Sequence, residues 1–211
     1  PDDVDEYNSW SAIFSRLMVP SRTIAGRKGS CIIPMAGLGQ RFVDEGYVVT
    51  KPLIPVSGRP MVVQATYDLP AAENHVFVVR EDMKGYAEVC TMINALYPNA
   101  VIKAIDGVTE GQACTALIGL DALAENDSGI YGPITFGACD NGALYNADKL
   151  LKLSETPEID VIVWGIRGYC NAARSPAMFG WIDSDEHGKI KAISVKKPLS
   201  NPKSDPVVLG T

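Results

Sequence analysis

The sequence has few of the groups that build metal clusters or disulfide frameworks. Its 211 residues include two histidines and five cysteines, and no two cysteines form a C-x-x-C pair. An odd number of cysteines in this arrangement suggests neither a zinc site nor a complete disulfide set. No apolar run approaches the roughly 20 residues that cross a bilayer, and no signal peptide opens the chain. We therefore expect reduced thiols, a cytoplasmic location and no membrane partner.

Positive charge is also scarce. The chain carries 19 Lys and Arg against 25 Asp and Glu, which gives a formal net charge of −6, and the basic residues are scattered. Nucleic acids and anionic membrane surfaces attract proteins with a basic face, so neither is expected as a general partner. Any anion site must be local, and the 46% of hydrophobic residues predict one sizeable folded core around it.

Two common phosphate-binding motifs are absent, and this limits the kind of anion site that the chain can form. A glycine turn, Gly37 and Gly39, follows a short apolar run, and Arg41 and Lys51 come soon after it. Glycines permit positive φ angles and present successive backbone N–H groups to an anion, so this stretch predicts a polyphosphate site. No G-x-x-x-x-G-K-[ST] loop occurs in the chain, and a dinucleotide fingerprint would need glycine where Phe42 stands. Both of those interpretations are disfavoured.

Apolar runs and helical patterns alternate after residue 28. The runs predict strands at 31–33, 75–79, 101–105, 133–138 and 160–166, and the helical patterns fall at 60–69, 82–96, 109–124 and 146–153. Residues 178–182 and 190–195 flank a turn and predict a hairpin. The pattern predicts an α/β fold with a mostly parallel central sheet, flanking helices and a small antiparallel extension.

The two ends of the chain differ from this pattern. Residues 1–28 read as an extension with a short amphipathic helix, and residues 29–211 as the main domain. The chain starts at Pro1 and stops just after the apolar run 207–209. We expect a C-terminally truncated domain, as in a piece of a longer multidomain polypeptide.

The stretch around the glycine turn resembles the sugar-1-phosphate nucleotidyltransferase family. It contains A-G-L-G-Q-R-F from Ala36, K-P-L-I-P-V from Lys51 and G-R-P-M from Gly58. The similarity continues at residues 109–113, 139–140 and 196–198, and it is greatest to the capsule and surface-polysaccharide branch. The resemblance implies a three-layer, Rossmann-like nucleotide-diphospho-sugar transferase fold. It also implies a Mg²⁺-dependent enzyme that joins an NTP and a sugar-1-phosphate, or a related phosphorylated metabolite, with release of pyrophosphate.

The resemblance also implies roles for particular residues. Arg41 would stabilise the leaving pyrophosphate, and Lys51 would neutralise charge at the α-phosphate. Asp140 would bind Mg²⁺, and Lys197 would hold the phosphate of the acceptor. The nucleotide would be bound by the glycine turn and by a loop at the base, that is, by Ala36, Gly37, Leu38, Gly39, Glu110 and Gly111.

No general base is required, because a phosphate monoester has a second pKa near 6 and is largely deprotonated at pH 7. His75 and His187 are accordingly interpreted as structural or surface residues.

Several alternatives stay open at this stage. Residues 109–112 read equally as a helix capping box, and Asp140 could cap the following helix. Val195 or Lys196 stands where the family usually has Glu. A glycosyltransferase would use a D-x-D motif, which occurs at residues 183–185, and a degenerate nucleotide-binding or regulatory domain would bind without turnover. The base, the sugar and a homo-oligomeric state are not specified.

Overall fold

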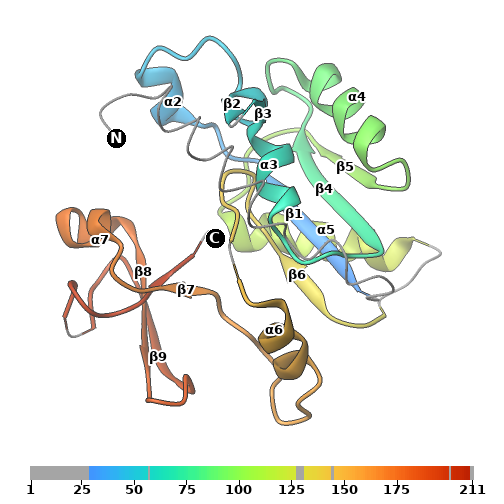
Figure 1. Ribbon diagram of the computed structural model, residues 1–211. Helices are drawn as coiled ribbons and strands as arrows, with labels where there is room; N and C mark the ends of the chain where they lie inside the picture. The colour runs from blue at the N-terminus through green and yellow to red at the C-terminus, as the bar shows by residue number, and fades with distance from the viewer. Residues whose placement is uncertain (1–28, 57, 127–130, 144, 200, 210–211) are drawn as a thin grey trace. The chain divides into compact units, whose positions relative to one another are not determined.

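The computed structural model describes residues 29–209 apart from 57, 127–130, 144 and 200 (Figure 1). The predicted amphipathic helix within residues 1–28 lies outside the described residues. The chain divides into two compact units, Pro1–Leu150 and Leu151–Thr211, and the division falls within helix α6 (Ala147–Ser154).

The first unit is built on a parallel sheet, as the apolar runs predict. Its strands stand in the order β5-β4-β1-β6, and every neighbouring pair is parallel. Strand β1 is buried along its whole length because it lies between two other strands and is covered on both faces. The strands are β1 (Ser30–Met35), β4 (Asn74–Arg80), β5 (Val101–Ile105) and β6 (Ile134–Phe136).

Helices cover both faces of this sheet and complete three layers (Figure 1). Helices α3 (Met61–Tyr67) and α4 (Tyr86–Leu96) pack on one face, where Val62 and Val89 join Phe77 in a common core. Helix α5 (Gln112–Glu125) packs on the other face. Gly119 permits this close packing, since a Cβ there would stand 2.5 Å from Cγ2 of Ile32. The predicted fold class is confirmed.

Short elements fill the loop between β1 and α3. They are α2 (Gln40–Asp44), the 3₁₀ turn η1 (Lys51–Leu53) and the small hairpin of β2 (Pro55–Val56) with β3 (Arg59–Pro60).

Three of the predicted elements need correction. The helix expected from residue 109 begins at Gln112 with Gly111 as its N-cap. No side chain in the described part of the chain caps it, because the Thr109 hydroxyl donates to the Gly111 carbonyl at 2.9 Å. The strand expected at 160–166 is only β7 (Gly165–Ile166). The strand expected to be buried at 133–138 is the short β6, which ends the sheet order and leaves Phe136 exposed.

The second unit contains an antiparallel sheet of order β7-β10-β8-β9. Strands β8 (Gly180–Ser184) and β9 (Ile190–Val195) form the predicted hairpin, and β10 (Val207–Val208) pairs with both β7 and β8. Its core centres on Trp181, whose indole Nε1 donates to the Pro176 carbonyl at 2.9 Å. Helix α7 (Cys170–Arg174) and the 3₁₀ turn η2 (Pro176–Met178) precede the hairpin.

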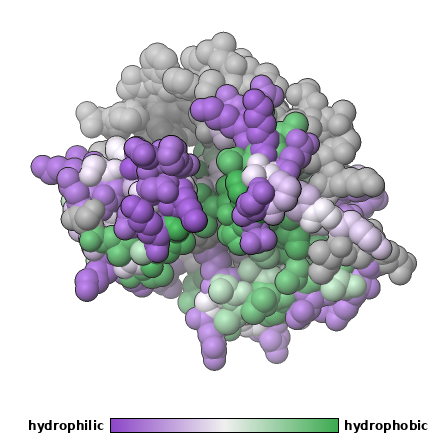
Figure 2. Space-filling view, turned by 90° about the horizontal axis from the view of Figure 1, so that it is seen from below, coloured by the Kyte–Doolittle hydropathy of each residue, from purple (hydrophilic) through white to green (hydrophobic). Residues whose placement is uncertain are grey.

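The surface of the described residues is mixed in polarity. Apolar residues gather in patches among hydrophilic ones on the face shown in Figure 2. Within the described part of the chain, no helix is both long and apolar enough to cross a membrane. Cys31, Cys90, Cys114 and Cys139 are free thiols.

Candidate active site

The site is assembled at the carboxyl end of the parallel sheet. The glycine turn follows β1 directly, and the loop that carries Asp140 follows the adjacent strand β6. Carboxyl ends of parallel strands share one edge, and ligands of open α/β sheets bind there. The backbone N–H of Gly137, the residue after β6, donates to the Ile32 carbonyl of β1 at 3.0 Å and extends the pairing of the two strands.

Lys51 and Asp140 form the centre of the site. Nζ of Lys51 lies 2.5 Å from Oδ2 of Asp140, and the two side chains are 23% and 29% exposed. The same ammonium lies 5.7 Å from the centroid of the Phe42 ring, which packs edge-on against Tyr47. An ammonium and a carboxylate of opposite charge are thus held together in a partly solvated position at the sheet edge.

Gly39 can lie close to Lys51 because of its backbone conformation and because it has no side chain. Its φ of +65° is a left-handed conformation that favours glycine, and a Cβ there would stand 3.1 Å from Cβ of Lys51. Gly37 differs, because a Cβ at Gly37 would meet no described atom within 4 Å. Ala36 is buried, whereas Gly37 and Leu38 are exposed, so the glycine turn presents an open backbone beside the ammonium.

The Asp140 loop is held against the end of α3. A Cβ on Gly142 would stand 2.5 Å from Oδ2 of Asp68, and Gly137 makes a similarly close approach to Leu69. Asp68 also accepts a hydrogen bond from the Gln64 amide at 2.9 Å. Sequence reasoning missed these glycines, although their positions on either side of an expected metal ligand could have signalled close packing.

Asp140 does not act as the cap of α6. Oδ1 of Asn146 accepts the backbone N–H of Lys149 at 2.9 Å and performs that role. The Asp140 carboxylate therefore faces Lys51 and the amide of Asn141, at 3.4 Å, with no helix to cap.

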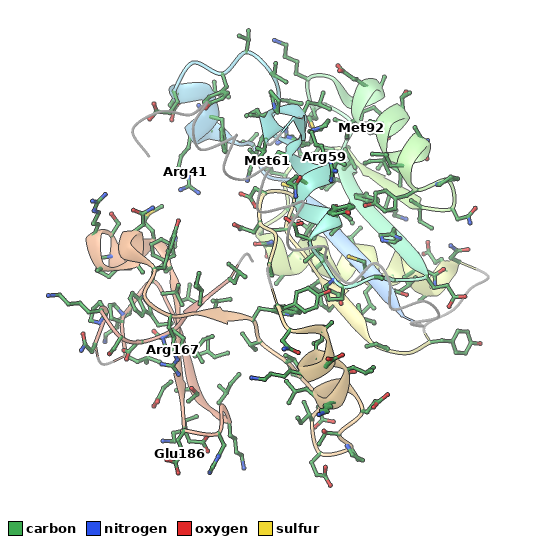
Figure 3. The ribbon with its side chains drawn as sticks, viewed as in Figure 1. Arg41, Arg59, Met61, Met92, Arg167 and Glu186 are labelled. Atoms are coloured by element: carbon green, nitrogen blue, oxygen red, sulfur yellow. The ribbon has the colours of Figure 1, made fainter. Side chains whose placement is uncertain are left out.

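Arg41 lies on α2, and its exposed side chain projects from that helix (Figure 3). Glu110 and Gly111 are exposed in the loop between β5 and α5, at the same sheet edge as the glycine turn. A Cβ on Gly111 would meet no described atom within 4 Å. Among the described residues, no hydrogen bond or ion pair joins these three to the Lys51–Asp140 pair, and their roles stay predictions.

Lys197 lies in the second unit, two residues after the end of β9, and is exposed. Its neighbour Lys196 has a φ of 60°, which is uncommon outside glycine, and donates its backbone N–H to the Phe179 carbonyl at 2.8 Å. The role of Lys197 in holding the acceptor phosphate stays a prediction.

The D-x-D motif has a structural use. Oδ1 of Asp185 accepts the backbone N–H groups of His187 and Lys189 at 2.9 and 2.8 Å, so the carboxylate closes the turn between β8 and β9. The hydrogen bond from Lys189 is the main reason that the pKa of Asp185 is lowered. A carboxylate used in this way does not support the glycosyltransferase alternative.

The two histidines lie in packed or exposed positions, and the cysteine next to Asp140 is a buried thiol. His75 packs against Tyr97, with ring centroids 4.5 Å apart, and His187 lies in the exposed turn beside Glu186. Burial raises the pKa of the Cys139 thiol to about 11, so at neutral pH it is not a thiolate nucleophile.

A divalent cation could be held by Asp140. Within the described residues, no group of three or more His, Cys, Asp or Glu side chains is suited to a metal ion. Mg²⁺ needs no such cage, because it commonly binds one or two carboxylates and completes its shell with waters and substrate phosphates. The donor set at Asp140 fits this mode of binding.

Known structures share this fold. The nucleoside-diphosphate-sugar pyrophosphorylase from Vibrio cholerae RC9 aligns with a TM-score of 0.61 at 21% identity, over 85% of this chain and 73% of its own. The inositol-1-phosphate CTP transferase from T. maritima aligns at 0.62 and 15%, over 88% and 69%. A UDP-glucose pyrophosphorylase complexed with UDP-glucose aligns at 0.57 and 16%, over 87% and 74%. At identities this low, the structural likeness shows the fold class alone, which is nucleotide-diphospho-sugar transferase-like. No protein-family model and no curated protein matches the chain.

Proposed function

We propose that the chain is a Mg²⁺-dependent nucleotidyltransferase that joins an NTP to a sugar-1-phosphate, or a related phosphorylated metabolite, and releases pyrophosphate. The observation that carries the proposal is the Lys51–Asp140 pair, with Nζ and Oδ2 2.5 Å apart beside the glycine turn. A cation, a hard carboxylate and open backbone amides thus meet at the ligand-binding edge of the sheet. The structures that share the fold are described as pyrophosphorylases and a CTP transferase, which supports this choice of reaction.

In the proposed reaction, an oxygen of the acceptor phosphate attacks the α-phosphorus of the NTP. The bond between the α-phosphorus and the bridging oxygen breaks, and pyrophosphate leaves with the electron pair. Catalysis of this kind depends on positioning and on neutralising charge in the transition state. The nucleophile is already an anion at neutral pH, so the site needs no base.

The residues of the site divide this work. Backbone groups of Gly37 and Gly39 bind the nucleotide phosphates, Lys51 faces the α-phosphate and Arg41 the departing pyrophosphate. Asp140 would hold Mg²⁺, which when bound would neutralise the charge of the phosphate oxygens. In the structure Lys51 is the counter-ion of Asp140. Binding of an anionic nucleotide gives the ammonium a second partner and frees the carboxylate.

Lys197 and the base loop complete the proposal. Lys197 contacts the phosphate of the acceptor, and Glu110 with Gly111 contacts the base. The resemblance to the capsule-type branch favours a sugar nucleotide used in polysaccharide biosynthesis as the product.

A pyrophosphate-release screen tests the proposed function. The protein is incubated with Mg²⁺, each common NTP and a panel of phosphorylated sugars and polyols. Pyrophosphate release that requires both an NTP and one acceptor is the expected result. Nucleotide binding without turnover for any pair would identify a binding or regulatory domain and reject the enzyme assignment.

A further inference from the structure

A buried arginine lies at the same edge of the sheet and has no part in the site described above. Arg80 is the last residue of β4 and is 6% exposed. Its Nε lies 2.9 Å from Oδ1 of Asp82. Nη1 makes no hydrogen bond within the described part of the chain, and the contact of Nε with Asp82 is an ion pair that lacks hydrogen-bond geometry. A buried donor that lacks an acceptor is costly, so such a group calls for an explanation.

The strand pattern places Arg80 beneath the start of α5. Val76 belongs to the cluster that contains Ala122 and Leu123, and Val78 lies beside Gly119. Side chains two residues apart on a strand share a face, so Val76, Val78 and Arg80 all face α5. Each step of two residues along β4 reaches a part of α5 that is closer to the start of that helix. Arg80 is the next member of this row. It therefore faces the first turns of α5, where Thr115 is buried.

The loop that holds Glu110 and Gly111 covers the same end of α5. The Thr109 and Thr115 hydroxyls are 2.6 Å apart, and the Thr109 hydroxyl donates to the Gly111 carbonyl. Strand β4 stands between β1 and β5 in the sheet. Arg80 thus ends the strand that separates the glycine turn from the Glu110–Gly111 loop.

Two sets of donors meet at this place. Helix α5 has 14 residues, and no side chain of the described residues caps its N-terminal N–H groups. The alternation along β4 brings the guanidinium, a donor with no acceptor capacity, to the same end of this helix. A helix N-terminus disfavours a nearby cation and favours oxygen atoms that carry negative charge, so both sets of donors call for an oxygen-bearing ligand.

The charges around Arg80 indicate which oxygen atom of a nucleotide its guanidinium would bind. The carboxylate of Asp82 already offsets the charge of Arg80, so the guanidinium lacks an acceptor more than it lacks a counter-ion. The phosphates of the proposed NTP have Lys51, Arg41 and the glycine turn. Among the other oxygens of the nucleotide, a carbonyl of the base is the one that would lie beside the Glu110–Gly111 loop, which the proposal assigns to the base and which follows the strand next to β4.

Resting on the proposed function, we infer that Arg80 is a specificity-determining residue that donates a hydrogen bond to a carbonyl oxygen of the nucleotide base. Uracil, cytosine and guanine carry such an oxygen, whereas adenine presents only ring nitrogens and an amino group. The protein should therefore use an oxo-base nucleotide and discriminate against ATP.

Calorimetric titration with UTP, CTP, GTP, ATP and inorganic tripolyphosphate tests this inference. At least one oxo-base nucleotide should bind about 10- to 100-fold more tightly than ATP, the ratio expected for one hydrogen bond to a charged group. Arg80→Met should remove this preference and leave tripolyphosphate binding within twofold. Arg80→Lys should retain part of it. Arg59→Met is the matched control: it removes an exposed arginine that stacks on Tyr67 at 4.7 Å, and it should change nothing.

Three results would overturn the inference. ATP could bind as tightly as every oxo-base nucleotide in the unaltered protein, a result that does not depend on the folding of any variant. Tripolyphosphate binding could fall in parallel with nucleotide binding in Arg80→Met, which would make Arg80 a phosphate ligand. Thermal stability could fall while base preference persists, which would make Arg80 structural. Loss of base discrimination alone leaves the proposed function intact, whereas failure of the protein to bind any NTP rejects both.

Discussion

Replacing Lys51 by methionine separates the chemical role of this residue from its structural role. The substitution keeps the length and the apolar stem of the side chain and removes only the ammonium. In the folded protein that ammonium contacts the Asp140 carboxylate at 2.5 Å, with the two side chains 23% and 29% exposed. Ion pairs with this degree of solvation contribute about 1 kcal/mol or less to folding. Unfolding by urea should therefore show a loss of that size or smaller.

The effect on turnover should be much larger. If Lys51 neutralises charge at the α-phosphate, its removal resembles the loss of one transition-state donor, which costs about 10²- to 10³-fold in kcat, or ~2.7–4 kcal/mol. Initial rates of pyrophosphate release, measured at saturating nucleotide, report this loss directly. Nucleotide affinity should change far less than turnover, because the remaining phosphate contacts are kept.

Lys103→Met is the matched control for Lys51→Met. Nζ of Lys103 lies 3.6 Å from the Glu125 carboxylate, so this variant also removes one Lys–carboxylate pair of the first unit. It should lower stability by a similar small amount and leave turnover unchanged. The reasoning is refuted if Lys51→Met keeps turnover within about twofold, or if the two variants lose activity equally.

Further expectations concern the glycine turn and the buried thiols. Gly39→Ala should cost about 1 kcal/mol of stability and lower turnover, because φ is +65° and the new Cβ would press on Lys51. Gly37→Ala should fold normally and weaken only nucleotide binding, because a Cβ there meets no described atom within 4 Å. Urea titration and calorimetry distinguish these outcomes, and an equal loss of stability in both variants would contradict the assigned geometry. Burial raises the pKa of Cys31 from 9.0 to about 12 and that of Cys139 from 9.0 to about 11, so the stabilisation from keeping these thiols neutral is complete below pH 9 and is lost as pH rises toward 11 to 12. Both thiols should resist alkylation in the folded protein at pH 8 and react on unfolding, as mass spectrometry of labelled peptides can show; rapid labelling of either in the folded protein would contradict their burial.

The sequence predicts much of the fold because local patterns specify it. The apolar run at 101–105 coincides with β5, and the hairpin of β8 and β9 follows from two apolar runs around a turn. Local patterns are weaker where tertiary position decides. Residues 133–138 look buried in isolation, yet β6 lies at the end of the sheet order, which exposes Phe136. Helix α5 also begins later than predicted, at Gln112 and not at residue 109, because the Thr109 hydroxyl donates to a carbonyl instead of capping the helix.

The site shows the same division. The family resemblance implies that Gly39, Lys51 and Asp140 act in one site, whereas the ion pair of Lys51 and Asp140 is found only in the structure. That contact depends on β1 and β6 being neighbours, which is a property of strand order. Arg80 is the opposite case. It stands in the sequence as one charged residue after an apolar run, and only its burial and its unpaired Nη1 draw attention to it.

Phosphorus-31 NMR of one reaction mixture tests the central claim most directly. The protein, Mg²⁺, the NTP that it binds most tightly and an acceptor sugar-1-phosphate are followed over time. Attack at the α-phosphorus should produce pyrophosphate and a new diphosphate diester in equal amounts, with both absent when the acceptor is omitted. Formation of NDP and inorganic phosphate, or of NMP without a diester, would place the reaction elsewhere and contradict the account.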